Sequence, residues 1–123
     1  MARGFRLTPQ GQPRLSENDV ERACLDLLGL RGWYTIRLQV GLFRTLGERG
    51  HMIRVGTPGL PDYVAVHEKH RAFFMETKAP GKRLSKEQEK TQWAIRECYR
   101  IAVVSIDRVE QLAPWLDAHE AGT

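Results

Sequence analysis

Hydrophobic and polar residues along this chain follow two patterns: the spacing typical of helices and the alternation typical of strands. Ser16 has the character of a helix N-cap, and the apolar residues after it recur at helical spacing. They are Val20, Cys24, Leu27 and Leu28. This pattern predicts a first helix that ends at residues 29–32, where Gly29 and Gly32 interrupt it.

The middle of the chain has the pattern of strands, because its segments alternate or are rich in β-branched and aromatic side chains. These segments are residues 33–40, 51–55, 63–67 and 71–78. Residues 41–50 show neither the helical nor the strand pattern and are expected to be a loose connection. In segment 71–78, Phe74, Glu76 and Lys78 should share one face, because successive side chains of a strand point to opposite sides.

The last third of the chain predicts two helices around one strand. Ser85 resembles an N-cap and Gln88 stands at the capping-box spacing, so a helix is expected after them. Its residues that should face the core are Trp93, either Ala94 or Ile95, and Cys98. Residues 101–106 are apolar except for Ser105, and this run predicts a strand buried on both faces. A final helix is marked by Val109, Leu112, Ala113 and Leu116 and should end near His119.

These elements predict an α/β fold in which helices flank a central mixed sheet. The chain of 123 residues is long enough for one domain. We place this domain at residues 16–119, after a basic arm at residues 1–15 and before a tail at residues 120–123. The arm carries Arg3, Arg6 and Arg14 without a regular pattern, which is typical of a flexible terminus or of an arm that contacts DNA or a partner.

Charge and cysteine content narrow the class of protein. The net charge of +4 and the pI of about 9.4 favour a polyanionic partner. Cys24 and Cys98 form no CxxC motif, which is typical of reduced residues in a cytosolic protein. The chain has no apolar run near the ~20 residues needed to cross a bilayer and no secretory leader pattern. We therefore expect a cytoplasmic protein without a membrane partner.

The residues best suited to chemistry lie in two short segments. The first is the loop 56–62, in which prolines and glycines restrict the backbone and Asp62 stands at a strand entrance. The second is Glu76-Thr77-Lys78, where Glu76 and Lys78 share one face of a strand. If the two strands pair, Asp62 reaches the same face, and two acids and a lysine meet at one point.

Such a group of side chains predicts a divalent-metal site with a built-in cation. Asp62, Glu76 and the backbone carbonyl of Thr77 could hold Mg²⁺, with Mn²⁺ as a substitute, and leave positions for water. The metal would lower the pKa of a bound water and neutralise charge on a scissile phosphate. Lys78 would orient the attacking water, help to deprotonate it or stabilise the pentavalent state, and the sequence leaves these roles open.

A lone Glu-x-Lys pattern is common on exposed strands, but here it stands among further motifs. These are Ser16-Glu17, Arg37, the segment from Gly56 to Asp62, Glu76-Thr77-Lys78 and Ser85-Lys86-Glu87-Gln88. Together they cover nearly the whole chain from Ser16 to the last helix. In this combination the sequence resembles the PD-(D/E)XK nuclease superfamily, and within it the stand-alone phage and bacterial members of the VRR-NUC (virus-type replication-repair nuclease) branch.

The resemblance implies a restriction-endonuclease-like core in which Asp62 and Glu76 bind the metal and Lys78 is the catalytic lysine. Gln88 matches a glutamine that family members carry on the helix after the catalytic strand. The acid on the first helix is ambiguous, because Glu17 matches the VRR-NUC spacing, whereas Glu21 better matches archaeal junction resolvases. Both residues lie on one face of the predicted helix, and we favour Glu17.

The function that the resemblance implies is that of a Mg²⁺-dependent deoxyribonuclease. The small domain favours recognition of branched DNA through phosphates over base readout, with a four-way (Holliday) junction as the preferred substrate. The expected state is a homodimer, in the bacterial cytoplasm or a phage-infected cell. Candidate DNA contacts are Arg37, Arg44, Arg54, Lys82, Arg83 and Lys86. Two alternatives stay open: a flap or single-strand nuclease of the same fold, and a non-catalytic DNA-binding or assembly protein on a nuclease-like scaffold.

Aromatic and histidine residues add little to this site. Trp33, Trp93 and Trp115 are expected to anchor the core or an interface. His67 and His70 have a spacing compatible with zinc, but they flank a predicted turn and lack further ligands.

Overall fold

A four-stranded sheet forms the centre of the structure, a computed structural model that describes residues 15–38, 41–44, 50 and 52–122. Its strands, in spatial order, are β1 (Tyr34–Arg37), β4 (Tyr63–Val66), β5 (Phe73–Thr77) and β6 (Ala102–Ile106). The first two pairs are antiparallel and β5–β6 is parallel, so helix α2 (Lys86–Trp93) makes the crossover that a parallel pair requires. The predicted α/β class with a mixed sheet is confirmed.

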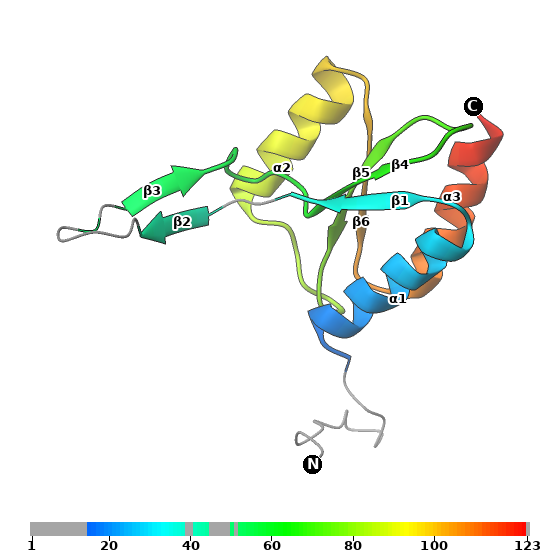
Figure 1. Ribbon diagram of the computed structural model, residues 1–123, viewed down its shortest axis with the longest axis horizontal. Helices are drawn as coiled ribbons and strands as arrows, with labels where there is room; N and C mark the ends of the chain where they lie inside the picture. The colour runs from blue at the N-terminus through cyan, green and yellow to red at the C-terminus, as the bar shows by residue number, and fades with distance from the viewer. Residues whose placement is uncertain (1–14, 39–40, 45–49, 51, 123) are drawn as a thin grey trace, which may run out of the picture.

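Helices α1 (Glu17–Leu30) and α3 (Leu112–Ala121) pack together on one face of the sheet (Figure 1). A 3₁₀ turn, η2 (Val109–Gln111), precedes α3. In the sheet, Met75 pairs with Val104 and Thr77 with Ile106, and all four side chains are buried. The other members of this core are Val20, Cys24, Leu28, Trp33, Tyr63, Ala65, Phe73, Leu112 and Leu116.

Helix α2 and its π-helical continuation η1 (Ala94–Cys98) belong to the opposite face. Glu76 pairs with Ser105 there, and both side chains bond to glutamines of α2. The predicted alternation along β5 is therefore confirmed: Phe73, Met75 and Thr77 enter the core, and Glu76 faces the helix. Both expected N-caps, Ser16 and Ser85, also form capping boxes.

The side that α2 presents to the sheet was predicted wrongly. The expected core residues Trp93 and Cys98 are exposed, and Gln92 is buried instead. The sheet face beneath the helix carries Glu76 and Ser105, so polar rather than apolar side chains turn toward it. The π turn then changes the helical period after Trp93, because i→i+5 bonds such as Tyr99 N–H to the Ala94 carbonyl replace the α-helical ones.

Two predictions about strands also need correction. Segment 41–50, expected to be a loose connection, contains strand β2 (Gly41–Arg44), which pairs antiparallel with β3 (Met52–Val55). This two-stranded ribbon projects away from the four-stranded sheet (Figure 1). Strand β6 is an edge strand with only Val104 and Ile106 buried, not a strand buried on both faces.

Helix α3 extends slightly past its expected end near His119, to Ala121, and therefore includes Glu120. Its carboxylate accepts hydrogen bonds from Arg31 at 2.6 Å and from the Trp33 indole at 2.9 Å. Apart from Leu15, the predicted basic arm lies outside the described residues.

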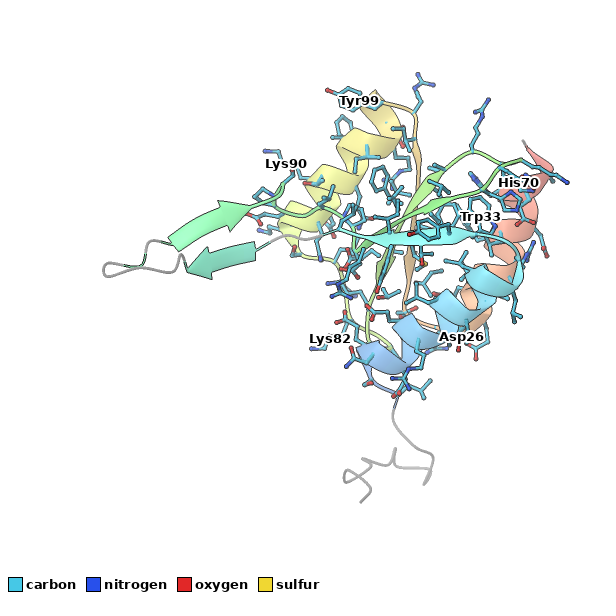
Figure 2. All side chains as sticks on the ribbon, viewed as in Figure 1. Asp26, Trp33, His70, Lys82, Lys90 and Tyr99 are labelled. Carbon is cyan, nitrogen blue, oxygen red and sulfur yellow. The ribbon has the colours of Figure 1, made fainter. Side chains whose placement is uncertain are left out.

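Trp33 is a core residue, as expected. Its ring forms a T-shaped contact with Phe73 and stacks with His70 (Figure 2), and Trp115 also forms a T-shaped contact with Phe73. Lys82 and Tyr99 instead point away from the fold (Figure 2). Of the helices in the described ranges, none has the length and apolar character needed to cross a membrane.

Candidate active site

The loop before β4 is clamped to helix α2. Gly59 has φ of +79°, and a Cβ added there would lie 2.3 Å from the Glu87 carbonyl oxygen. The Thr91 hydroxyl donates a hydrogen bond of 2.7 Å to the Pro58 carbonyl, and Pro61 is fully buried. These contacts leave the loop little freedom, and they place Asp62 at the entrance of β4, as the sequence predicts.

We expect Gly59→Ala to damage both the fold and the site. Its left-handed backbone alone should cost about 1–3 kcal/mol, and the clash with α2 must move the loop. A displacement of Asp62 by ~1 Å should reduce any cleavage activity by ~10²-fold. Thermal melts and cleavage rates should be compared with those of Gly81→Ala, which has φ of +81° but no atom within 4 Å of the new Cβ. Equal losses in both variants would contradict a role for the close approach to α2.

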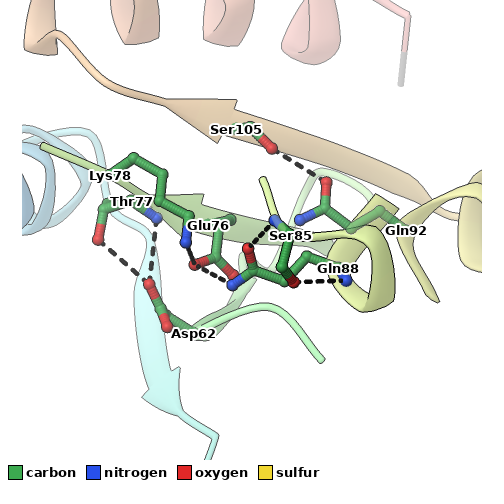
Figure 3. A network of polar contacts seen from close by, with 8 residues as sticks. All are labelled: Asp62, Glu76, Thr77, Lys78, Ser85, Gln88, Gln92 and Ser105. Atoms are coloured by element: carbon green, nitrogen blue, oxygen red, sulfur yellow. Dashed lines mark hydrogen bonds and ion pairs between the residues drawn. The ribbon is translucent and has the colours of Figure 1, made fainter. Parts of the chain in front are cut away.

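Asp62 is fixed at both its backbone and its side chain. Its carbonyl accepts a hydrogen bond of 2.8 Å from Leu38 N–H, which follows β1. Its Oδ2 accepts from the Thr77 backbone N–H at 3.1 Å and from the Thr77 hydroxyl at 3.3 Å (Figure 3). The carboxylate is thereby held against the end of β5, next to Glu76.

Glu76 is the most unusual acid in the described chain, because it is only 2% exposed. Its Oε2 lies 3.3 Å from the Gln88 amide nitrogen and 3.8 Å from Lys78 Nζ (Figure 3). Its Oε1 is buried without a hydrogen-bond partner among the described residues. Burial, followed by the nearby charge of Asp62, raises the pKa of Glu76 to about 8, although Lys78 acts in the opposite direction.

Gln88 connects the start of α2 to this carboxylate. Its Oε1 accepts from Ser85 N–H at 2.9 Å, and its backbone N–H donates to the Ser85 hydroxyl at 3.1 Å. Because the capping box requires the amide oxygen at Ser85, the amide nitrogen must turn the other way, toward Glu76 Oε2. One side chain thus caps the N-terminus of α2 and donates to the candidate metal ligand.

Basic residues line a cavity next to Lys78. The cavity has a volume of about 350 Å³ and is lined by Glu17, Lys78, Ala79, Lys82 and Arg83. The loop that carries Lys82 is held to the end of β6, because Gly81 N–H donates to Asp107 Oδ2 at 3.0 Å. This backbone hydrogen bond is the main reason why the pKa of Asp107 is lowered. The Lys78 side chain is 20% exposed, so it joins the buried Glu76 carboxylate to the open cavity.

The two candidate acids of α1 occupy different surroundings. Glu17 lines the cavity beside Lys78, and its charge contributes to the raised pKa of Glu76. Glu21 instead forms an ion pair of 3.3 Å with Arg37 Nη1, and the same nitrogen donates to the Tyr63 hydroxyl at 3.0 Å. This placement is consistent with the choice of Glu17.

Glu17→Gln should therefore reduce turnover by ~10-fold or more, the scale expected when a group around a metal site is changed. Glu21→Gln should leave turnover near the wild-type value, because it breaks an exposed ion pair of about 0–1 kcal/mol. Single-turnover rates at saturating protein would measure both effects. The reverse order of the two rates would assign the role to Glu21.

The remaining predicted residues are spread around this centre. Arg37 lies over the Tyr63 ring, and Lys86 is the exposed first residue of α2. The backbones of Arg44 and Arg54 lie on the β2–β3 ribbon. Sequence reasoning missed Gln92, whose only signal was its spacing of four residues from Gln88.

The oxygen atoms available as metal ligands at the candidate site match the preference of Mg²⁺ for one or two carboxylates with further oxygen or water ligands. Asp62 and Glu76 supply the carboxylates, and the unpartnered Glu76 Oε1 is suited to bind a cation. In the described ranges, no group of three or more His, Cys, Asp or Glu side chains forms a metal cluster. The backbone carbonyl of Thr77 as a third ligand stays a prediction.

Comparison of the sequence with known protein-family models and with curated proteins finds no match to either.

Proposed function

We propose that this protein is a metal-dependent DNA endonuclease with a restriction-endonuclease-like PD-(D/E)XK core. The observation that carries the proposal is the meeting of Asp62, buried Glu76 and Lys78 at the adjoining ends of β4 and β5. A buried acid with an unpartnered oxygen beside a second acid is costly for a fold, and a divalent cation would offset that cost.

Asp62, Glu76 and the Thr77 carbonyl would hold Mg²⁺, or Mn²⁺ in its place. The bound ion would supply Lewis-acid polarisation of the phosphate and a water of lowered pKa. Gln88 donates to Glu76 Oε2 and limits the orientations of this carboxylate. Lys78 lies beside the same oxygen and faces the cavity, where it can stabilise negative charge on the scissile phosphate.

The charge around the site favours a nucleic acid as substrate, and we propose that this nucleic acid is DNA. Lys82 and Arg83 line the cavity beside Lys78, and Lys86 lies exposed at the start of the next helix. Arg44 and Arg54 occupy the ribbon that leads through the Gly56–Pro61 loop to Asp62. The cations of Lys82, Arg83 and Lys86 suit contacts with phosphates, which respond to the shape of DNA rather than to its bases. Branched DNA, with the four-way junction first, is therefore the proposed substrate.

A homodimer would give such an enzyme two sites for paired incisions, and a two-fold interface is the simplest arrangement. Edge strand β1 supports this part of the proposal, because it exposes Tyr34 and Ile36. Light scattering of the 14.1 kDa chain, alone and on junction DNA, should show two subunits. A monomer under both conditions would contradict the dimer.

Cleavage of a panel of labelled DNAs tests the proposed function. Four-way junction, flap, single-stranded and linear duplex substrates should be incubated with Mg²⁺, Mn²⁺ or EDTA. We expect cleavage with either metal, none in EDTA, and the highest rate on the junction. A preference for flaps or single strands would favour a flap or single-strand nuclease of the same fold. Metal-independent binding without any cleavage would favour the non-catalytic DNA-binding alternative.

A further inference from the structure

Helix α2 buries the amide of Gln92, which has no role in the proposed reaction. Gln92 is 2% exposed, whereas the adjacent Trp93 is 55% exposed. Turning a tryptophan inward would bury far more apolar area, so the helix forgoes a large hydrophobic gain. The inward glutamine therefore calls for a specific polar role.

Two anchors place Gln92 next to Glu76. Its Oε1 accepts a hydrogen bond of 3.0 Å from the Ser105 hydroxyl, and Ser105 is the register partner of Glu76 in the β5–β6 pair. Gln88, one helical turn earlier, donates to Glu76 Oε2. In Figure 3 the Gln92 amide oxygen turns to Ser105, and its nitrogen turns to the side on which Glu76 lies.

Both residues carry a buried polar atom without a hydrogen-bond partner in the described chain. These atoms are Gln92 Nε2, a donor, and Glu76 Oε1, an acceptor. Rotating the Gln92 amide by half a turn would bring its oxygen toward the negative carboxylate, which is unfavourable. When Glu76 is ionised, its charge selects the orientation in which the positive end of the amide dipole faces it.

We propose that Gln92 is a positioning residue for Glu76, and that Ser105 holds its amide in place. The amide dipole keeps the Glu76 carboxylate in one orientation and raises the affinity of the site for a divalent cation. The effect on the affinity for a divalent cation rests on the proposed function. Partners that orient metal ligands typically contribute 10–100-fold in metal affinity.

A double-mutant cycle in EDTA, at a pH above the value of about 8 to which the pKa of Glu76 is raised, tests the coupling between Gln92 and Glu76 without metal or DNA. Gln92→Met keeps a similar volume and removes the amide, and Glu76→Gln removes the charge that the amide faces. In the wild-type background, Gln92→Met should lower the melting temperature, because the carboxylate loses a favourable dipole. In the Glu76→Gln background the loss should be smaller or absent, because the charge that the amide faces is gone. The same change in both backgrounds would overturn the proposal.

Calorimetric titration with Mg²⁺ alone tests the effect on the site. Gln92→Met should weaken Mg²⁺ binding by roughly 10–100-fold. Ser105→Ala should weaken it less, because the amide remains but is free to rotate. Lys90→Met, an exposed change on the same helix, is the matched control and should bind Mg²⁺ like the wild type. Unchanged affinity in Gln92→Met would refute the role in metal binding. Absence of binding by the wild type would instead refute the proposed metal site, while the cycle in EDTA still reports on Gln92 and Glu76.

Discussion

Glu76→Gln should abolish cleavage and at the same time make the metal-free protein more stable. The substitution removes a proposed metal ligand, so we expect a loss of at least ~10²-fold in rate. It also removes a buried carboxyl group that lies beside Asp62, while Gln88 and Lys78 remain nearby. Melting in EDTA should rise by roughly 4 °C or more, equivalent to ~1 kcal/mol for a domain of this size. Rate assays with Mg²⁺ and melts in EDTA measure the two effects.

The pH dependence of the melting temperature tests whether the higher stability of Glu76→Gln comes from the loss of the buried carboxyl group. Since the pKa of Glu76 is raised from 4.5 to about 8 in the fold, the folded state binds a proton that the unfolded state releases in this window. Wild-type stability in EDTA should therefore fall, relative to Glu76→Gln, as the pH rises from about 4.5 to 8. Glu89→Gln, an exposed change on α2, should show no such trend. A stable but fully active Glu76→Gln protein would remove the proposed site.

Lys78→Ala should lose cleavage by ~10²-fold or more, the scale of a lost electrostatic partner in the transition state. Its Nζ lies 3.8 Å from Glu76 Oε2 and Lys78 lines the cavity, so under the proposed function it acts at the reacting phosphate rather than along the duplex. Affinity for junction DNA in Ca²⁺ should change little, because one contact among many is lost. Rates at saturating protein and binding isotherms in Ca²⁺ separate these quantities.

The double variant Lys82→Ala/Arg83→Ala is the matched control for Lys78→Ala. It should bind junction DNA more weakly, and its salt slope should fall by roughly two, one for each lost phosphate contact. Cleavage at saturating protein should be retained. If Lys78→Ala instead bound poorly and cleaved normally once bound, Lys78 would be an ordinary phosphate contact.

Local features of the fold were predictable because their causes are local. Ser16 and Ser85 cap helices through residues three positions away, and alternation along β5 separates Glu76 from Phe73 and Met75. The Pro-Gly loop before Asp62 was likewise visible, because its constraints lie within a few residues. None of these inferences needed knowledge of distant neighbours.

Features that depend on distant neighbours were predicted less well. The apolar pattern of 101–106 indicated a strand buried on both faces, but its place at the sheet edge depends on the order of all four strands. Strand β2 lacks a clear pattern of its own and is defined by pairing with β3. The inward side of α2 was missed because hydrophobicity favoured Trp93, whereas the polar sheet face selected Gln88 and Gln92.

The sequence by itself determined which side chains could do chemistry and on which elements they stand, because spacing, capping and alternation are properties of short segments. It thereby pointed to Asp62, Glu76 and Lys78. The tertiary structure decided how these groups are held and charged. Antiparallel pairing of β4 and β5 brings Asp62 to Thr77, and packing of α2 buries Glu76 beneath two glutamines. Burial and the pairing of two acids are relations between elements far apart in the chain, so only the assembled sheet and helix produce them.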